Sequence, residues 1–184
     1  MINSSLKRAV AVAILAGASV GANAATDLGT LPATPPTGFA GTVLGGGTSF
    51  SEIFTFTLSE PNIGSSYLVQ NVPTTVSPAV TFDGILSAIS LFSAGANGVV
   101  GGGDDTLLAS SVNPGGDSLS LDYGQSLSGA SYITVSGISN GSAGAIFAGQ
   151  VATVVPEPET YAMLLAGLGL MGAVVRRRGT SKTS

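Results

Sequence analysis

The chain has 184 residues, of which 44% are hydrophobic and only 9% are charged, and its net charge at pH 7 is −4. It has no cysteine and no histidine, which excludes disulfides, thiolate metal sites and nucleophiles that a histidine would activate. Lysine and arginine occur only near the two ends, so residues 25–154 carry acidic side chains alone, and an acidic surface repels phosphates and excludes nucleic-acid binding.

Residues 1–24 predict a secretory signal peptide. Lys7 and Arg8 form a short positive region, an apolar stretch follows, and Ala22 and Ala24 supply the small side chains before a cleavage site. The apolar stretch of about 12 residues is too short to cross a bilayer, which needs about 20. We therefore expect export through the Sec translocon and cleavage after Ala24 by signal peptidase.

Residues 25–154 have the pattern of an all-β domain. Apolar and polar side chains alternate between turn residues that recur about every 8 to 12 positions, and no stretch has helical period. The alternation is clearest over residues 50–58, where Phe50, Phe54 and Phe56 share one face. Further strands are expected at 67–72, 80–83, 85–92, 106–112, 119–123, 132–138 and 145–154. The pattern predicts a single antiparallel β-sandwich at residues 25–154, with a turn at 114–116.

A glycine-rich loop from Ala94 to Asp104 separates two of these strands. Gly103 to Leu107 matches half of a calcium-binding G-x-D-x-L repeat, which makes Asp104 and Asp105 weak candidates for metal ligands. Such repeats bind metal by stacking several copies, and this one occurs once. We therefore interpret the segment as a hairpin loop with solvated acids, and we expect no cofactor.

The other carboxylates do not predict an active site. Glu52 shares the parity of the phenylalanines of its strand, and we expect it to bond backbone amides in a structural role. Glu52 with Glu60, or Asp117 with Asp122, could form a glycosidase pair, but the sequence does not fix their separation. We expect the protein not to be an enzyme.

The tail begins with a rigid stem and an apolar helix. Pro156, Glu157 and Pro158 hold the chain extended, because proline is excluded from a helix interior. The apolar run that follows predicts a transmembrane helix at about residues 160–175, whose apolar part, Tyr161 to Val175, is about 22 Å long against a hydrocarbon core of about 30 Å. The alternatives are a plain tail anchor and a soluble hydrophobic helix.

Three arginines end the apolar run. Arg176, Arg177 and Arg178 would stop transfer and hold residues 179–184 in the cytoplasm by the positive-inside rule. We therefore expect transient anchoring in the inner membrane with the sandwich on the outer side.

The complete tail, residues 155–178, closely resembles the PEP-CTERM sorting signal of Gram-negative bacteria: a Pro-Glu-Pro triplet, a short apolar helix with Leu164 to Leu170, and an arginine cluster. The resemblance implies recognition by exosortase, an integral-membrane cysteine protease or transpeptidase, with removal of the helix. It also implies release or attachment at the cell surface, and an association with exopolysaccharide, biofilm and floc formation.

Two stretches of the central domain carry further resemblances. Phe50 to Phe56 is similar to the F-x-D-x-Y strand of one PEP-CTERM subfamily, with Glu52 in place of Asp and Phe54 in place of Tyr. Leu127 to Gly137 is similar to an L-x-x-G-x-Y-x-x-V-x-G strand of secreted jelly-roll sandwiches. The first resemblance implies membership of that subfamily, and the second implies a jelly-roll-like fold.

The sequence therefore predicts a secreted, exosortase-processed, non-enzymatic component of the cell surface or extracellular matrix. A carbohydrate- or calcium-dependent adhesion module is the alternative. The Ser, Thr and Gly that dominate the outward positions fit either the plain low-charge composition of small exported proteins or a surface selected for self-assembly or matrix contact.

Overall fold

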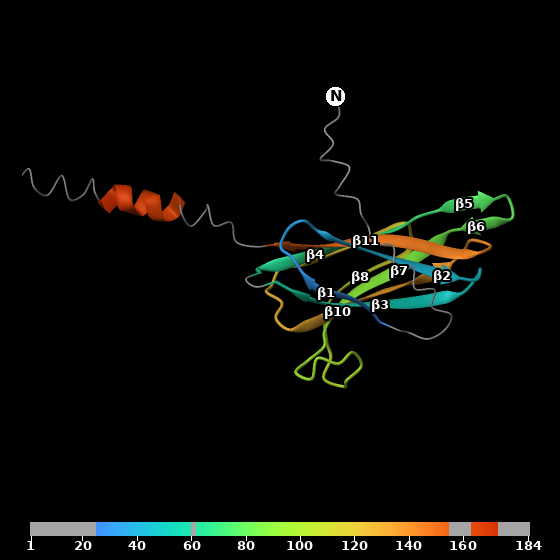
Figure 1. The fold of residues 1–184 in the computed structure, drawn as a ribbon, viewed down its shortest axis with the longest axis horizontal. Coiled ribbons are helices and arrows are strands. Elements are labelled where there is room, and N and C mark those ends of the chain that lie inside the picture. The colour runs from blue at the N-terminus through green and yellow to red at the C-terminus, as the bar shows by residue number, and fades with distance from the viewer. Residues whose placement is uncertain (1–24, 60–61, 155–162, 173–184) are drawn as a thin grey trace, which may run out of the picture. The chain divides into compact units, whose positions relative to one another are not determined.

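The computed structural model describes residues 25–59, 62–154 and 163–172, and the chain divides into two compact units, Met1–Val154 and Val155–Ser184 (Figure 1). The first unit contains two β-sheets, and the described part of the second contains a helix at residues 163–172. The predicted signal peptide, with Ala22 and Ala24, lies outside the described residues.

The strands form a five-stranded and a six-stranded sheet. The first has the order β1-β3-β10-β7-β8; the second has the order β5-β6-β11-β4-β9, and β2 also pairs with β11. Their bounds are β1 Thr26–Leu31, β2 Thr37–Leu44, β3 Ser49–Leu58, β4 Gly64–Asn71, β5 Thr74–Ser77, β6 Val80–Phe82, β7 Gly84–Ser93, β8 Thr106–Gly116, β9 Ser118–Tyr123, β10 Ala130–Ser139 and β11 Gly144–Val154.

Apolar side chains from both sheets form one core. The face predicted for β3 is confirmed, since Phe50, Phe54, Phe56 and Leu58 are all buried. Phe54 lies with its ring centroid 6.1 Å from that of Phe147 on β11, in the opposite sheet, in an edge-to-face arrangement. Each such side chain stabilises the fold by about 1.5 to 3 kcal/mol through removal of apolar area from water.

Glycines inside the strands make room for these rings. A Cβ on Gly41 would overlap the ring of Phe147, and a Cβ on Gly149 would overlap the ring of Phe39. The two glycines lie on the paired strands β2 and β11, so each strand accepts a phenylalanine from the other. The glycine content that interrupts the alternation in the sequence is thus a packing requirement.

The predicted all-β class is confirmed, but the prediction of antiparallel pairing throughout is wrong. β1 pairs parallel with β3, and β6 pairs parallel with β11 through Phe82 and Gly144. These pairings depart from the jelly-roll-like sandwich that we expected. Strands β1, β2 and β5 were not expected, because glycines break the alternation in the first two and β5 is only four residues long.

The turn expected at 114–116 is also wrong. β8 continues to Gly116, which pairs with Leu86 of β7 after a shift of register. Gly115 adopts a φ of 94°, a left-handed conformation that glycine tolerates and that is common at bulges. The strand therefore continues through Gly115 with a shift of register and ends at Gly116.

The helix at residues 163–172 lies within the predicted transmembrane segment. Along the part of the chain that the structure describes, no helix is both long and apolar enough to cross a membrane. The rest of the segment predicted at 160–175 lies outside the described residues.

Candidate functional site

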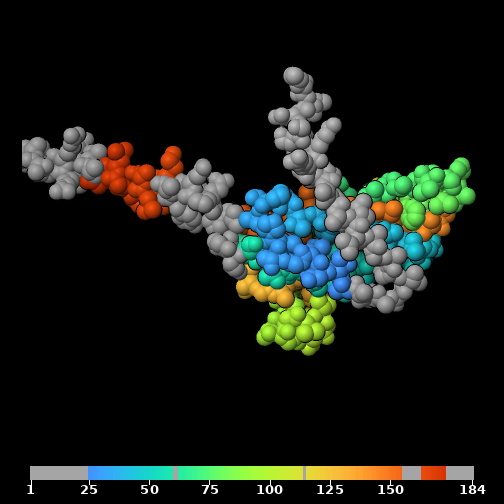
Figure 2. Space-filling view, viewed as in Figure 1, coloured from blue at the N-terminus to red at the C-terminus, as the bar shows by residue number. Residues whose placement is uncertain are grey.

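The loop at residues 94–105 joins β7 to β8 and protrudes from the sandwich as a yellow-green lobe (Figures 1 and 2). Gly95, Gly98, Gly101 and Gly103 have φ angles of 65°, 65°, 75° and 86°, in the left-handed region that other residues avoid. Four positive φ angles within nine residues let the loop backbone turn back toward the carboxylates of Asp104 and Asp105. The loop is the candidate metal site that the sequence suggested.

Asp104 organises the first half of the loop. Its Oδ2 accepts hydrogen bonds from the backbone N–H groups of Ala96, at 2.9 Å, and Asn97, at 3.2 Å. A Cβ on Gly95 would overlap this carboxylate, so glycine is required at that position. Although Asp104 is exposed, one of its oxygens is occupied by the loop itself, which differs from the solvated acid that the sequence suggested.

Asp105 connects the second half of the loop to the sheet. Its Oδ2 accepts from the backbone N–H of Gly101 at 2.6 Å and from the hydroxyl of Tyr132 at 2.8 Å. Its Oδ1 is buried and has no partner among the described residues. Among the described loop residues, this oxygen is the one buried carboxylate atom without a hydrogen-bond partner.

Tyr132 is the residue of this site that the sequence analysis missed. Its ring stacks on Phe92, with the ring centroids 4.9 Å apart and the planes inclined by 6°. Burial and then the hydrogen bond to the Asp105 carboxylate raise the pKa of Tyr132 to about 12. Only the register of β10 against β7 brings it to the loop, and no local signal in the sequence indicates that contact.

The geometry limits what the loop can do chemically. In the described portion of the chain, no group of three or more acidic, histidine or cysteine side chains is placed to hold a metal ion. Asp104 and Asp105 could offer a cation two carboxylates, with their other oxygens engaged by the protein. The arrangement fits a structural role for the two aspartates. The buried Oδ1 of Asp105 is the one observation that supports the weak assignment as a metal ligand.

The remaining carboxylates are separated by the fold. Asp117 directly precedes β9 and Asp122 is its penultimate residue, about 16 Å further along an extended chain at roughly 3.3 Å per residue, whereas glycosidase pairs lie about 5 to 9.5 Å apart. Glu52 is half-buried in β3, and Glu60 lies outside the described residues. The structure thus does not bring Asp117 and Asp122 together.

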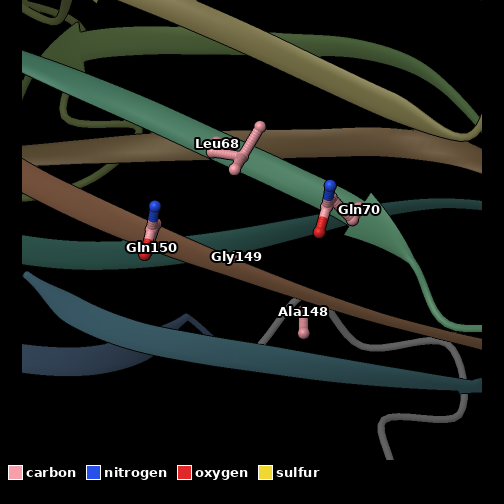
Figure 3. Close-up of a pocket in the computed structure, with 5 residues that line it drawn as sticks. All are labelled: Leu68, Gln70, Ala148, Gly149 and Gln150. Carbon is pink, nitrogen blue, oxygen red and sulfur yellow. The ribbon is translucent and has the colours of Figure 1, made fainter.

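A shallow pocket of about 240 Å³ lies over β4 and β11 (Figure 3). Its lining residues are Leu68, Gln70, Ala148, Gly149 and Gln150. Ala148 pairs with Gln70 and Gln150 pairs with Leu68, so the two amide side chains lie diagonally across the paired strands. Both glutamines are exposed and neither is charged. The pocket therefore offers neutral donors and acceptors over a partly apolar floor.

The predicted sorting residues Pro156, Glu157, Pro158 and the arginines Arg176, Arg177 and Arg178 lie outside the described residues. A model of the PEP-CTERM protein-sorting motif matches residues 154–178. The chain therefore carries this motif, as predicted. The motif indicates processing by exosortase and export to the cell envelope or surface.

The chain is similar to the solved structure of the pre-peptidase C-terminal domain of collagenase from Bacillus anthracis, at 13% identity and a TM-score of 0.40, over 72% of this chain and 99% of that one. No curated protein matches the sequence. The assignment to the F-x-D-x-Y subfamily stays a prediction.

Proposed function

We propose that the protein is an exported, exosortase-processed passenger whose β-sandwich is a non-enzymatic structural component of the cell surface or extracellular matrix. The observation that carries this proposal is the position of the sorting motif, which begins at Val154, the last residue of β11. Removal of residues 155–184 would take away none of the eleven strands described. The described sandwich can therefore stay folded after the sorting signal has been removed.

The packing supports this division. The core side chains that the structure describes run from Leu31 to Val151, so none of these would be lost on processing. The last strand is closed by a backbone hydrogen bond from Ile63 N–H to the Val154 carbonyl, 2.9 Å long. A cut in the stem that follows would leave this bond in place, and we expect the processed protein to keep the stability of the full chain.

The side-chain chemistry supports a structural role. Residues 25–154 contain no lysine, arginine, histidine or cysteine, the groups that most often activate a nucleophile or move a proton. Asp104 and Asp105 bond to backbone in their loop, and Asp117 and Asp122 lie apart. These features favour a structural protein on the cell surface and disfavour an enzyme.

The test uses the native host with and without its exosortase. We expect the cell-associated protein to be shorter in the parent strain than in the deletion strain by the mass of the tail, as read by mass spectrometry of its C-terminal peptide. In the parent strain, replacement of Pro156 and Pro158 by alanine should reproduce the long form, while the matched change Glu159→Gln, just outside the triplet, should not. An unchanged C-terminus in the deletion strain would refute the proposal.

The pocket over β4 and β11 favours a second candidate function, binding of a neutral exopolysaccharide. Gln70 and Gln150 present amides that can pair with sugar hydroxyls, and the acidic domain disfavours an anionic polymer. The double change Gln70→Ala and Gln150→Ala should reduce retention of the secreted protein on neutral glycan, while Ser120→Ala on β9 should not. Equal retention of both variants would exclude this function.

The unpartnered Oδ1 of Asp105 favours a calcium-dependent version of the same module. Binding that is specific to the folded state raises the melting temperature. This version predicts that millimolar calcium raises the melting temperature of the secreted protein and that Asp105→Asn abolishes the rise. No shift with calcium would remove this version and leave the structural proposal intact.

A further inference from the structure

We propose that Asn97 is a site of spontaneous modification, at which the folded loop promotes ring closure between its side chain and the backbone nitrogen of Gly98. Residues 25–154 contain two Asn-Gly pairs, Asn97-Gly98 and Asn140-Gly141. Glycine leaves the following backbone nitrogen unshielded by a Cβ, so either pair could react in an unfolded chain. The fold exposes one pair and protects the other.

The nucleophile at the first pair is free. Asn97 and Gly98 are both exposed, and the N–H of Gly98 donates to no acceptor among the residues that the structure describes. The Asp104 carboxylate holds the N–H of Asn97 at 3.2 Å and so fixes the start of the pair. The Gly98 nitrogen can therefore lose its proton to solvent without breaking a hydrogen bond of the loop.

The electrophile is also prepared. The Oδ1 of Asn97 accepts a hydrogen bond from the N–H of Val99 at 2.7 Å, and its Nδ2 lies 3.4 Å from the carbonyl oxygen of Gly102, so the side-chain amide is held against the loop backbone. Attack on Cγ would place a negative charge on this Oδ1. A donor already aimed at the atom where charge develops stabilises such an intermediate.

The reaction needs only water. The Gly98 nitrogen bonds to Cγ of Asn97, the bond from Cγ to Nδ2 breaks, and Nδ2 leaves as ammonia after taking up a proton. The resulting succinimide then adds water at one of its two carbonyls and opens to an aspartyl or isoaspartyl residue. The product carries one new carboxylate in the loop that already holds Asp104 and Asp105.

The second pair is blocked by Asp83. The carbonyl of Asp83 accepts from the N–H groups of both Asn140, at 2.8 Å, and Gly141, at 3.0 Å. The side-chain nitrogen of Asn140 also lies 3.4 Å from the Asp83 carboxylate. Gly141 is buried, so its nitrogen can attack only after this cluster opens.

The experiment compares the two pairs within one molecule. The full-length protein is incubated in mildly alkaline buffer, folded or in urea, and the peptides containing Asn97 and Asn140 are followed by their gain of one dalton. In the folded protein we expect conversion at Asn97 to be faster by about tenfold or more, because reaction at Asn140 must first break backbone hydrogen bonds. In urea the two rates should become similar.

Asn97→Gln and Asn140→Gln serve as matched controls, since each keeps the amide but lengthens the ring that would have to close. Each should remove the mass gain from its own peptide alone. Equal rates in the folded protein, a faster rate at Asn140, protection of both pairs by folding, or a tenfold difference that persists in urea would each overturn the proposal.

Discussion

The loop at residues 94–105 and the turn cluster around Asp83 both use carboxylates and glycines to shape the backbone, but they do so over different sequence distances. Asp104 accepts from residues seven and eight positions away in its own loop. Asp83 accepts from Asn71, twelve positions away at the end of β4, and from Asn140, fifty-seven positions away after β10. The first carboxylate shapes a loop, and the second joins strands.

This difference should decide how far a local change is felt. The contacts of Asp104 close a short loop, so losing them opens a lobe that few other residues depend on. Asp83 is half-buried, and its Oδ1 also accepts from the N–H of Gly84 at the start of β7. Losing Asp83 would therefore loosen β4, β7 and the turn between β10 and β11 together.

Glycine substitutions should give the largest contrast between the two regions. Gly144, at the start of β11, has a φ of 137°, and a Cβ there would overlap the carbonyl of Val43. Gly144→Ala should cost about 4 kcal/mol or more in the free energy of unfolding, since rigid backbone must move. Gly101→Ala, in the loop with a φ of 75° and open space around it, should cost only about 1 kcal/mol.

Urea unfolding of both variants checks this contrast. The measurement is informative because the two residues share a left-handed backbone and differ in what surrounds them. If both variants lost the same stability, backbone conformation alone would govern these glycines, and the close approach of β2 to β11 would be unimportant.

Removal of a carboxylate should also destabilise the turn cluster more than the loop, but the difference in the free energy of unfolding should be smaller than for the glycines. Asp83→Ala leaves the side-chain nitrogen of Asn71, which lies 2.8 Å from the carboxylate, without its acceptor. We expect a loss of about 3 kcal/mol for Asp83→Ala and about 1 kcal/mol for Asp104→Ala. Hydrogen exchange should spread over β4 and β7 in the first variant and stay within residues 94–105 in the second. If faster hydrogen exchange in Asp83→Ala were confined to the turn, Asp83 would not join the strands as we propose.

Sequence reasoning could find the strands whose pattern is local. β3 was predicted because its buried phenylalanines alternate with polar residues, and β10 and β11 were predicted as apolar runs on either side of the turn residues Ser139 to Ser142. β1 and β2 were missed because Gly29, Gly38 and Gly41 interrupt that period. β1 pairs parallel with β3, and the two strands are separated in the sequence by β2. No local sequence signal indicates a parallel pairing of this kind.

The same limit applied to the candidate site. The composition of the loop, five glycines followed by two aspartates, indicated a reversal with carboxylates at its end. It did not indicate that these carboxylates would bond to the backbone of the loop or to Tyr132, because that tyrosine lies twenty-seven positions beyond Asp105. The sorting motif was recognisable for the opposite reason, since all its parts are contiguous.

The last predicted change concerns a side-chain contact between the loop and the sheet. The hydroxyl of Tyr132 donates to Asp105, and Tyr132→Phe should cost about 1.5 kcal/mol at neutral pH through loss of a hydrogen bond to a charged acceptor. The change removes no ring, so the stack on Phe92 should persist and near-ultraviolet circular dichroism should keep its other features. A loss as large as that of Asp83→Ala would erase the distinction between the two regions.

The dependence on pH separates the hydrogen bond from simple packing. The pKa of Tyr132 is raised from 10.0 to about 12 in the folded protein, so between these values the unfolded chain has released a proton that the folded chain still holds. Stability from this group is therefore complete below about pH 10 and falls as pH rises toward 12. Tyr132→Phe should flatten this fall, while leaving the part due to Tyr67, whose pKa burial also raises. Asp105→Asn, which keeps an acceptor and removes the charge, should flatten it less, and an unchanged slope in Tyr132→Phe would show that the loop and the sheet are not coupled through this hydroxyl.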